Sequence, residues 1–232
     1  MLQGWLNAYV LHRRPYRETS FIVDFFSLEL GRVSAVARGV RSAKSDRRSL
    51  LQPFQSLRIQ LSGKADLKNL SQLEAAGPMN TIVGEALYCA LYVNELTNRV
   101  LPNAVETPEL YGRYGETLAG LQQTPHSPAL VLRQYELALL QELGVMPDFT
   151  TDAATEQPLE PALHYELIPE LGFCAVKQPS RLSFQGSELL LLQDGIFNQQ
   201  SLPAAKRLCR IALHPFVGDK PLKSRELFLA SR

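Results

Sequence analysis

Residues 31–54 read GRVSAVARGVRSAKSDRRSLLQPF, an alternating apolar pattern that runs directly into a strongly basic arm. Val33, Ala35 and Ala37 recur at every second position, which is the period of a strand with one buried face. The arm holds five cations against one acid, Asp46: Arg38, Arg41, Lys44, Arg47 and Arg48. A cationic segment beside ordered β structure is typical of phosphate binding, and the alternative is a solvated basic loop.

The segments on either side of this stretch also have the patterns of short strands. Their β-branched, aromatic and alternating apolar residues predict strands at 5–13, 20–26, 57–61 and 67–74. With the strand at 32–38, this gives five. In the first strand we expect Ala8 and Val10 on one face and Arg13 on the other, with the strand broken by the run from Arg13 to Tyr16. Short strands joined by turns and one long loop predict a small barrel, and the OB-fold is the small five-stranded barrel that commonly binds nucleic acid.

Beyond residue 80 the apolar spacing changes from the period of a strand to that of a helix. Thr107-Pro108 and Ser127-Pro128 are typical helix starts, with an N-cap residue followed by Pro at the first position. The expected helices cover residues 82–100, 108–122, 128–143 and 201–214, the last of them ending before Pro215.

Between the last two helices the sequence is polar and rich in turn residues. Short strands are expected at 164–168 and 172–176, and residues 181–200 carry no clear pattern. The predicted fold class is therefore α+β. It has an N-terminal OB-fold barrel at residues 1–79, followed by a mainly helical domain at 80–232 with a small irregular and β insertion at about 148–200.

The two parts of the chain carry opposite formal charge. Residues 1–80 contain 12 Lys and Arg against 6 Asp and Glu, although the whole chain is nearly balanced at 24 against 23. The later residues are therefore acidic. Polyanion binding is expected mainly in the N-terminal part.

The sequence lacks the motifs of common catalytic and metal sites. It contains no phosphate-binding loop, dinucleotide fingerprint, nucleophile elbow or zinc-protease motif, and its four histidines are scattered singly. Cys89, Cys174 and Cys209 form no Cys-x-x-Cys pair, so neither a disulfide framework nor a zinc site is expected. No apolar run approaches the roughly 18 residues of a membrane span. We expect a cytoplasmic protein without enzyme activity, cofactor or metal.

The last expected helix carries a cluster of cations. Lys206, Arg207 and Arg210 crowd one side of it, and like charges at this spacing repel one another unless an anion lies nearby. Arg133, on another expected helix, joins the cluster if the two helices pack together. The anion is either an external acidic ligand or the carboxylates of the domain itself.

Five blocks of the sequence, in order along the chain, resemble the RecO family of bacterial recombination and repair proteins. They are VLHRRPYRETSFIVDFFSLELGRVSAVARGVR at 10–41, LLQPF at 50–54, ALYCALYVNELTNRVLP at 86–102, LRQYELALLQELG at 132–144 and AAKRLCRIALHPFVGDKPLKSRELF at 204–228. The resemblance implies an OB-fold followed by a helical domain with an insertion. Many relatives carry four cysteines for zinc in that insertion, and this chain resembles the branch that lacks them.

The resemblance also implies a function in DNA recombination and repair. Members of the family bind single- and double-stranded DNA and anneal complementary strands. They act with RecR to load RecA onto DNA covered by single-strand-binding protein, whose acidic, Phe-terminated tail they recognise. We therefore expect a cytoplasmic, nucleoid-associated protein. The alternative is a protein-interaction scaffold whose arm contacts an acidic protein and never DNA.

Two groups of residues are then expected to form the binding sites. DNA phosphates are expected to contact the barrel and the arm through Arg13, Arg38, Arg41, Lys44, Arg47, Arg48, Lys64 and Lys68. The tail of single-strand-binding protein is expected to contact the helical domain through Arg133, Lys206, Arg207 and Arg210. Tyr16, Phe21 and Phe54 are candidates for base stacking, with core positions as the alternative.

Overall fold

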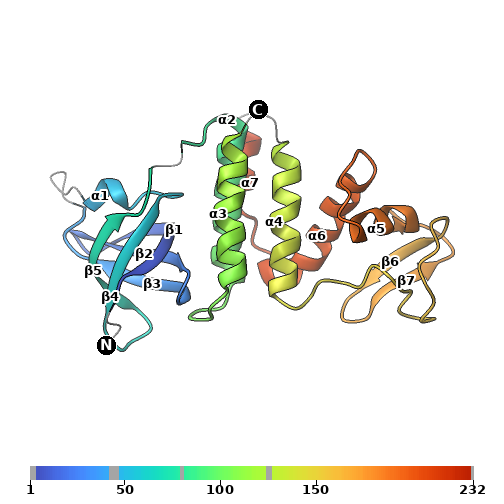
Figure 1. Cartoon of the computed structure of the whole chain (residues 1–232), viewed down its shortest axis with the longest axis horizontal. Helices are drawn as coiled ribbons and strands as arrows, with labels where there is room; N and C mark the ends of the chain where they lie inside the picture. Colours follow the sequence, from blue (N-terminus) through green and yellow to red (C-terminus); the bar gives the residue numbers. More distant parts are fainter. Residues whose placement is uncertain (1–3, 42–46, 79–80, 124–126, 231–232) are drawn as a thin grey trace. The chain divides into compact units, whose positions relative to one another are not determined.

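The N-terminal part of the chain folds as a closed five-stranded barrel. The computed structural model describes residues 4–41, 47–78, 81–123 and 127–230 (Figure 1). The strands of the barrel are β1 (Leu6–Tyr16), β2 (Ser20–Ser27), β3 (Gly31–Ala37), β4 (Ser56–Ser62) and β5 (Lys68–Ala75). They close in the order β1-β2-β3-β5-β4, with β3 and β5 parallel and the other neighbours antiparallel. This arrangement confirms the predicted OB-fold.

The barrel interior is filled by the alternate apolar side chains that the sequence predicted. Val33 and Ala37 of β3 are buried there with Val23 of β2. Leu51, which directly follows the short helix α1 (Arg47–Leu50), is fully buried in the same core. The side chain of Leu51 therefore fixes α1 to the barrel. Figure 1 shows this helix beside the barrel.

Strand β1 contains a bulge at Leu11. The register passes from Val10 opposite Phe25 to His12 opposite Asp24, so that Leu11 is an extra residue on its strand. A bulge of this kind reverses which face the following side chains occupy. His12 consequently faces outward beside Asp24, where its Nδ1 atom lies 3.6 Å from the carboxylate.

Because of the bulge, Arg13 lies on the opposite face of β1 from the one predicted. This residue lies opposite Val23, whose side chain is in the barrel core, so Arg13 is on the same face as Val23. The strand also continues to Tyr16. Both predictions for this segment, the outward face of Arg13 and the break at residues 13–16, were wrong because a bulge has no signature in composition or alternation.

The chain forms two compact units, residues 1–128 with 220–232 and residues 129–219. In the first unit the barrel is accompanied by α2 (Gly84–Val100), α3 (Pro108–Gln122) and α7 (Lys223–Ala230). Helices α2 and α3 match the predicted helices closely. Helix α7 was not predicted, because its packing depends on contacts with α2 rather than on its own pattern.

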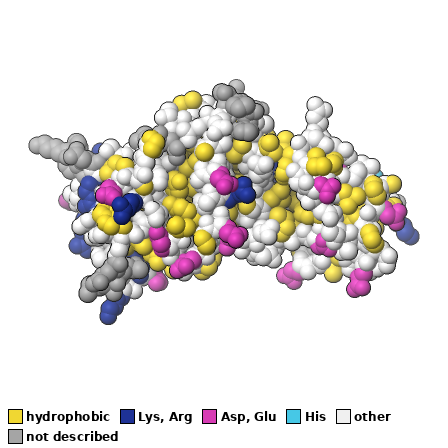
Figure 2. Space-filling model, in the orientation of Figure 1, with side chains coloured by type: hydrophobic (Ala, Val, Ile, Leu, Met, Phe, Trp, Pro, Cys, Tyr) yellow, Lys and Arg dark blue, Asp and Glu magenta, His cyan; other side chains and the backbone are white. Residues whose placement is uncertain are grey.

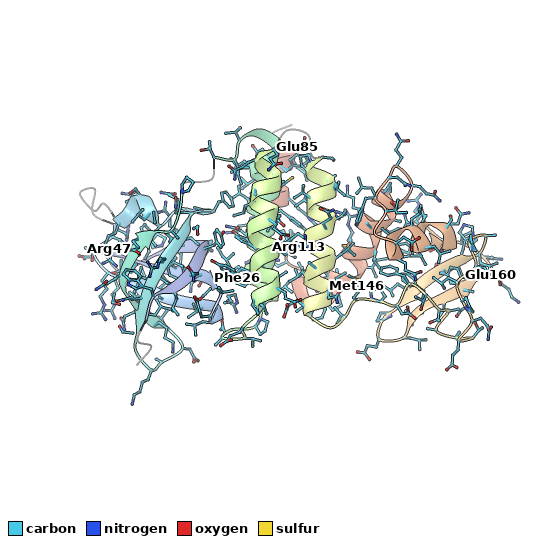
Figure 3. The ribbon with its side chains drawn as sticks, viewed as in Figure 1. Phe26, Arg47, Glu85, Arg113, Met146 and Glu160 are labelled. Carbon is cyan, nitrogen blue, oxygen red and sulfur yellow. The ribbon has the colours of Figure 1, made fainter. Side chains whose placement is uncertain are left out.

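Aromatic rings join the outer face of the barrel to α3. Tyr9 of β1 lies 4.9 Å from Tyr114, and Phe26 of β2 lies 5.4 Å from Tyr111, between ring centroids. Figure 3 shows Phe26 on the side of the barrel that faces α3. The amide of Asn94 on α2 also donates to two carbonyl oxygens of β1 at the bulge. These contacts bury β2 on both faces.

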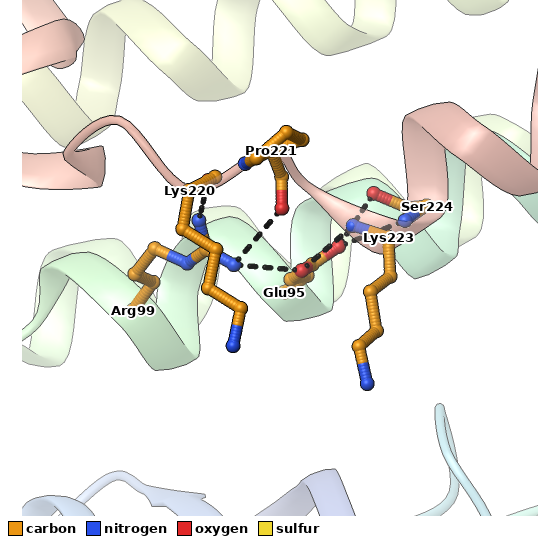
Figure 4. Close-up of polar contacts among 6 residues, drawn as sticks. All are labelled: Glu95, Arg99, Lys220, Pro221, Lys223 and Ser224. Atoms are coloured by element: carbon orange, nitrogen blue, oxygen red, sulfur yellow. Dashed lines mark hydrogen bonds and ion pairs between the residues drawn. The ribbon is translucent and has the colours of Figure 1, made fainter.

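The C-terminal segment is fastened to α2 by Glu95 and Arg99 (Figure 4). The Glu95 carboxylate accepts hydrogen bonds from the backbone N–H of Lys223 at 3.0 Å and of Ser224 at 2.9 Å. Arg99 donates to the carbonyl oxygen of Lys220 and pairs with Glu95 at 3.0 Å. The carboxylate thus satisfies the first amides of α7, which have no partners within that helix.

Glu95 makes the stability of the protein dependent on pH. Burial raises the pKa of this carboxyl, but the hydrogen bonds from Ser224 and Lys223 and the charge of Arg99 outweigh burial, so that the pKa lies below its ordinary value. The lowered pKa means that the ionised carboxylate stabilises the folded state. This stabilisation is fully present above the ordinary pKa of Glu and is lost as the pH falls through the pKa of the folded protein. We expect Glu95→Gln to lower the free energy of unfolding by about 1–2 kcal/mol at pH 7.

This difference should shrink towards zero as the pH falls below about 4. Urea unfolding of wild type and Glu95→Gln between pH 3 and 7 measures it. Glu85→Gln, an exposed change in the first turn of the same helix, is the matched control. A stability difference between wild type and Glu95→Gln that stayed constant across this range would contradict the role given to the Glu95 charge.

The second unit contains two long helices, a short helix and a small sheet. Its elements are α4 (Pro128–Glu142), β6 (His164–Ile168), β7 (Gly172–Val176), β8 (Phe184–Gln185), α5 (Gly186–Gln193) and α6 (Ser201–Val217). The sheet has the order β7-β6-β8, and its core is built around Tyr165, Phe173 and Phe184. No helix in the described part of the chain is both long and apolar enough to span a membrane.

The predicted strands of the insertion are confirmed, and two details of the unit differ from expectation. Residues 181–200, which had no clear pattern, contain β8 and α5. Helix α6 continues to Val217, so Pro215 lies inside its last turn instead of beyond its end.

Candidate nucleic-acid interface

Three basic residues from separate segments meet at one end of the barrel. The backbone N–H of Arg41 donates to the Thr19 carbonyl at 3.0 Å, and its Nη1 atom donates to the Arg17 carbonyl at 2.6 Å. These bonds join the loop after β3 to the turn between β1 and β2. Arg48 of α1 reaches the Arg41 carbonyl at 3.5 Å, which brings α1 to the same place.

Two more arginines reach this end through contacts with strand β5. Arg47 donates from Nη2 to the Ser71 carbonyl at 3.3 Å, and Arg38 donates from Nη2 to the Asn69 amide oxygen at 3.1 Å. Lys68 directly precedes Asn69. We call these residues together the cationic rim: Arg17, Arg38, Arg41, Arg47, Arg48 and Lys68. The exposed Lys64, also expected to contact DNA, lies in the turn between β4 and β5, at the end of β4 that is directed away from the β1–β2 turn.

The positive charge of the cationic rim is not paired with carboxylates in the part of the chain that the structure describes. Within the described residues, no rim side chain forms an ion pair with a carboxylate. Three acids of the barrel are engaged elsewhere: Asp24 pairs with Arg14, Glu74 with Arg58, and Glu29 accepts bonds from Asn7. The rim arginines instead donate to backbone carbonyls or a neutral amide, which fixes their positions and leaves their charge intact.

The figures place this charge away from the helices of the same unit. Figure 2 shows Lys and Arg side chains gathered on the barrel. In Figure 3, Arg47 lies on the opposite side of the barrel from Phe26, which faces α3. The outer face of β2 is buried, whereas the cationic rim lies on the exposed side of the barrel, where a polyanion has access.

Arg13 does not project from the rim. Its Nη1 atom donates to the Leu51 carbonyl at 2.8 Å and the Arg48 carbonyl at 3.3 Å, and its Nη2 atom donates to the Gln52 side chain at 3.2 Å. Burial, and then the charge of Arg48, lower the pKa of Arg13. The expectation that Arg13 is an outward-pointing phosphate contact does not fit this geometry, since the bulge at Leu11 turns the side chain inward.

The candidates for base stacking differ in how deeply they are buried. Phe21 and Phe54 are buried, which agrees with the alternative that they are core residues. Tyr16 is half-buried, and the guanidinium of Arg17 lies 5.2 Å from its ring centroid. Lys44 lies outside the described residues. Arg17 was missed in the sequence, although its charge beside a turn and an aromatic residue was an available signal.

In the second unit, the four cations expected to contact the tail of single-strand-binding protein differ in their carboxylate partners. Arg133 is only 9% exposed and pairs with Glu136, itself 1% exposed, at 2.6 Å. Arg207 lies 4.5 Å from the Phe184 ring centroid and pairs with Glu188 at 3.0 Å. These two side chains are therefore engaged with the carboxylates of their own unit.

Lys206 and Arg210 differ from the other two cations of this group. Both are exposed, one turn apart on α6, and among the described residues neither pairs with a carboxylate. His214, a further turn along, lies 3.7 Å from Asp219. The described residues contain no group of three or more His, Cys, Asp or Glu side chains arranged to hold a metal ion.

The fold and the rim define a class of protein: an OB-fold barrel with cationic side chains at one end, followed along the chain by helices. The chain belongs to the recombination protein O family. Residues 1–79 match the family model described as "Recombination protein O N terminal", and residues 83–226 match the one described as "Recombination protein O C terminal".

Relatives of similar length match over nearly the whole chain, and each of the following is named DNA repair protein RecO. The protein of Alteromonas mediterranea is 52% identical over 99% of this chain and 98% of its own. That of Pseudoalteromonas atlantica is 50% identical over 96% and 93%, and that of Vibrio parahaemolyticus is 43% identical over 98% and 93%. A solved asparaginyl-tRNA synthetase of Entamoeba histolytica matches with 16% identity and a TM-score of only 0.28, over 78% of this chain and 41% of its own, a likeness too weak to indicate a shared fold.

Proposed function

We propose that this protein is a DNA-binding recombination mediator in DNA repair, which holds single- and double-stranded DNA at the cationic rim. The observation that carries the proposal is a rim of six cations at one barrel end that have no carboxylate partner among the described residues. Mutual repulsion makes such a rim unfavourable unless a polyanion binds it. Because phosphate contacts carry little sequence information, the binding should be non-specific.

The same surface supports strand annealing without a catalytic group. Two DNA strands that bind one cationic surface are concentrated there, and their mutual repulsion is screened. No reaction has to be catalysed, so the proposed activity is not that of an enzyme. The names of the relatives place them in DNA repair, and we propose that this protein acts with RecR in the cytoplasm, at the nucleoid, to load RecA onto DNA covered by single-strand-binding protein.

A strand-annealing assay tests this function directly. Two complementary oligonucleotides, one carrying a fluorophore and the other a quencher, should anneal faster when the protein is added, and the effect should fall as salt rises. Repeating the assay with strands covered by single-strand-binding protein tests the mediator function. A scaffold whose rim contacts only an acidic protein partner would leave the annealing rate unchanged in both cases.

We further propose that Lys206 and Arg210 contact the acidic tail of single-strand-binding protein. Their charges are exposed and face the same side of α6, where a flexible acidic peptide has access to both. Arg133 and Arg207 are left out of this contact set because each already pairs with a buried or half-buried carboxylate of the unit.

For the tail contact, we expect the double substitution Lys206→Ala/Arg210→Ala to weaken binding of a fluorescently labelled tail peptide about tenfold, since two charge-assisted contacts of modest strength are lost. Fluorescence anisotropy measures the dissociation constant. Lys177→Ala/Arg181→Ala removes the same charge from exposed positions of the insertion and should leave it unchanged. Equal affinity of wild type and the α6 variant would exclude this contact.

A further inference from the structure

The guanidinium of Arg13 is bound entirely to one short segment of the chain. Its three hydrogen bonds go to the Arg48 carbonyl, the Leu51 carbonyl and the Gln52 side chain. All three acceptors lie in α1 or in the two residues that follow it. The guanidinium also lies over the Phe21 ring, 5.2 Å from its centroid, so the half-buried Arg13 contacts both Phe21 and α1.

Helix α1 needs such an external support. It has only four residues, Arg47–Leu50, and an isolated helix of this length is not stable in water. Its last carbonyl groups have no partners within the helix. Arg13 supplies donors and a positive charge at that end, while the buried Leu51 anchors the chain on its apolar side.

If Arg13 only supported α1, its position would cost free energy through repulsion between like charges. Arg13 places a positive charge beside Arg48, and this like-charge neighbour contributes to the lowered pKa of Arg13. A support without a charge would avoid this repulsion. The repulsion is relieved when an anion binds at the same end of the barrel, which links the position of Arg13 to the binding of a polyanion.

We propose that Arg13 is a positioning residue for DNA binding. It fixes the backbone of α1 so that Arg47 and Arg48 are held at the cationic rim, and it does not itself contact phosphate. This inference rests on the proposed binding of DNA at the rim. It assigns to Arg13 a role that depends on its planar fork of donors, since the two carbonyls and the amide are bound simultaneously by two nitrogens.

The substitution Arg13→Lys separates positioning from direct contact. Lysine keeps the charge and binds phosphate well, but it cannot reproduce the fork. We expect Arg13→Lys to weaken binding of a fluorescein-labelled oligo(dT) about tenfold at about 0.15 M salt, and to reduce the slope of log K against log salt by about 1.4, the loss of two single-strand contacts. A direct contact predicts wild-type affinity and an unchanged slope. Arg14→Lys, one residue away and bound to Asp24 instead of α1, is the matched control.

A double-mutant cycle tests whether Arg13 acts through α1. Arg47→Gln/Arg48→Gln should weaken binding, and adding Arg13→Lys to this pair should weaken it no further. Additive losses would overturn the proposal. If Arg47→Gln/Arg48→Gln leaves the affinity unchanged, DNA binding at the rim itself is refuted, whatever Arg13 does.

Hydrogen exchange gives a readout that does not involve DNA. In Arg13→Lys the backbone amides of residues 47–52 should exchange faster than in wild type, while the amides of β2 and β3 should keep their protection. Gln52→Leu, which removes one of the three acceptors, should give a smaller change in the same direction. Unchanged exchange at residues 47–52 in Arg13→Lys would exclude positioning.

Discussion

Replacing Arg41, Arg47 and Arg48 together with Gln is expected to lower the affinity for single-stranded DNA about fiftyfold at about 0.15 M salt. These three side chains come from two segments that meet at the cationic rim, and none has a carboxylate partner among the described residues. Gln keeps a hydrogen-bond donor for the carbonyl groups that each arginine now binds. The substitution therefore removes charge with little change to the local fold.

The salt dependence makes this prediction specific. If all six rim cations contact phosphates, log K for a single strand falls with log salt at a slope of about −4, and the triple variant should have a slope of about −2. Fluorescence anisotropy with labelled oligo(dT) between about 0.05 and 0.3 M NaCl gives both slopes. Arg113→Gln/Lys177→Gln/Arg181→Gln removes the same formal charge elsewhere and should change neither affinity nor slope by a comparable amount. Equal losses in both variants would show that only net charge matters, and not the rim.

The barrel and its charge were largely predictable from the sequence. Val33, Ala35 and Ala37 revealed β3 because alternation is a local property, and the cations of the arm are adjacent along the chain. The sequence could not show that Arg17 lies beside this arm in the folded protein. That contact depends on hydrogen bonds between the β1–β2 turn and the loop after β3, which are tertiary.

The placements of Arg13 and Arg133 differ from the expected ones for a common physical reason. In both cases a charged side chain was expected to face solvent or a ligand, as charged residues usually do. Arg13 is turned inward by the bulge at Leu11, which no local pattern predicts. Arg133 is held in a buried position by Glu136, three residues further on, and this spacing was a signal that the sequence did contain.

Helices α5 and α7 illustrate a different limit. Helix α5 contains GSELLLLQ, whose uninterrupted apolar run has no period that separates a helix from a strand. Its start depends on a capping box between Gln185 and Glu188, and Glu188 also pairs with Arg207 of α6. Helix α7 is short and depends on the Glu95 carboxylate of α2. The partner of α7 therefore lies in a distant part of the sequence, and in α5 the local capping box is supplemented by an ion pair to a residue 19 positions away.

The buried pair of Arg133 and Glu136 leads to the largest expected loss of stability. We expect Arg133→Ala to lower the free energy of unfolding by about 3–5 kcal/mol, because it leaves the buried Glu136 carboxylate without its counter-charge. The Cys209 thiol of α6 contacts the same carboxylate, so the pair lies where α4 and α6 meet. Urea unfolding followed by circular dichroism measures the loss.

A second variant shows whether this loss comes from the unpaired charge. Arg133→Met/Glu136→Leu replaces the pair by apolar side chains of similar size and should recover most of the stability. It should also bind the tail of single-strand-binding protein as tightly as wild type, because Lys206 and Arg210 are unchanged. If the double variant is stable but binds the tail weakly, Arg133 contacts the tail after all. If Arg133→Ala is as stable as wild type, the carboxylate of Glu136 does not depend on this arginine, and the buried pair has no structural role.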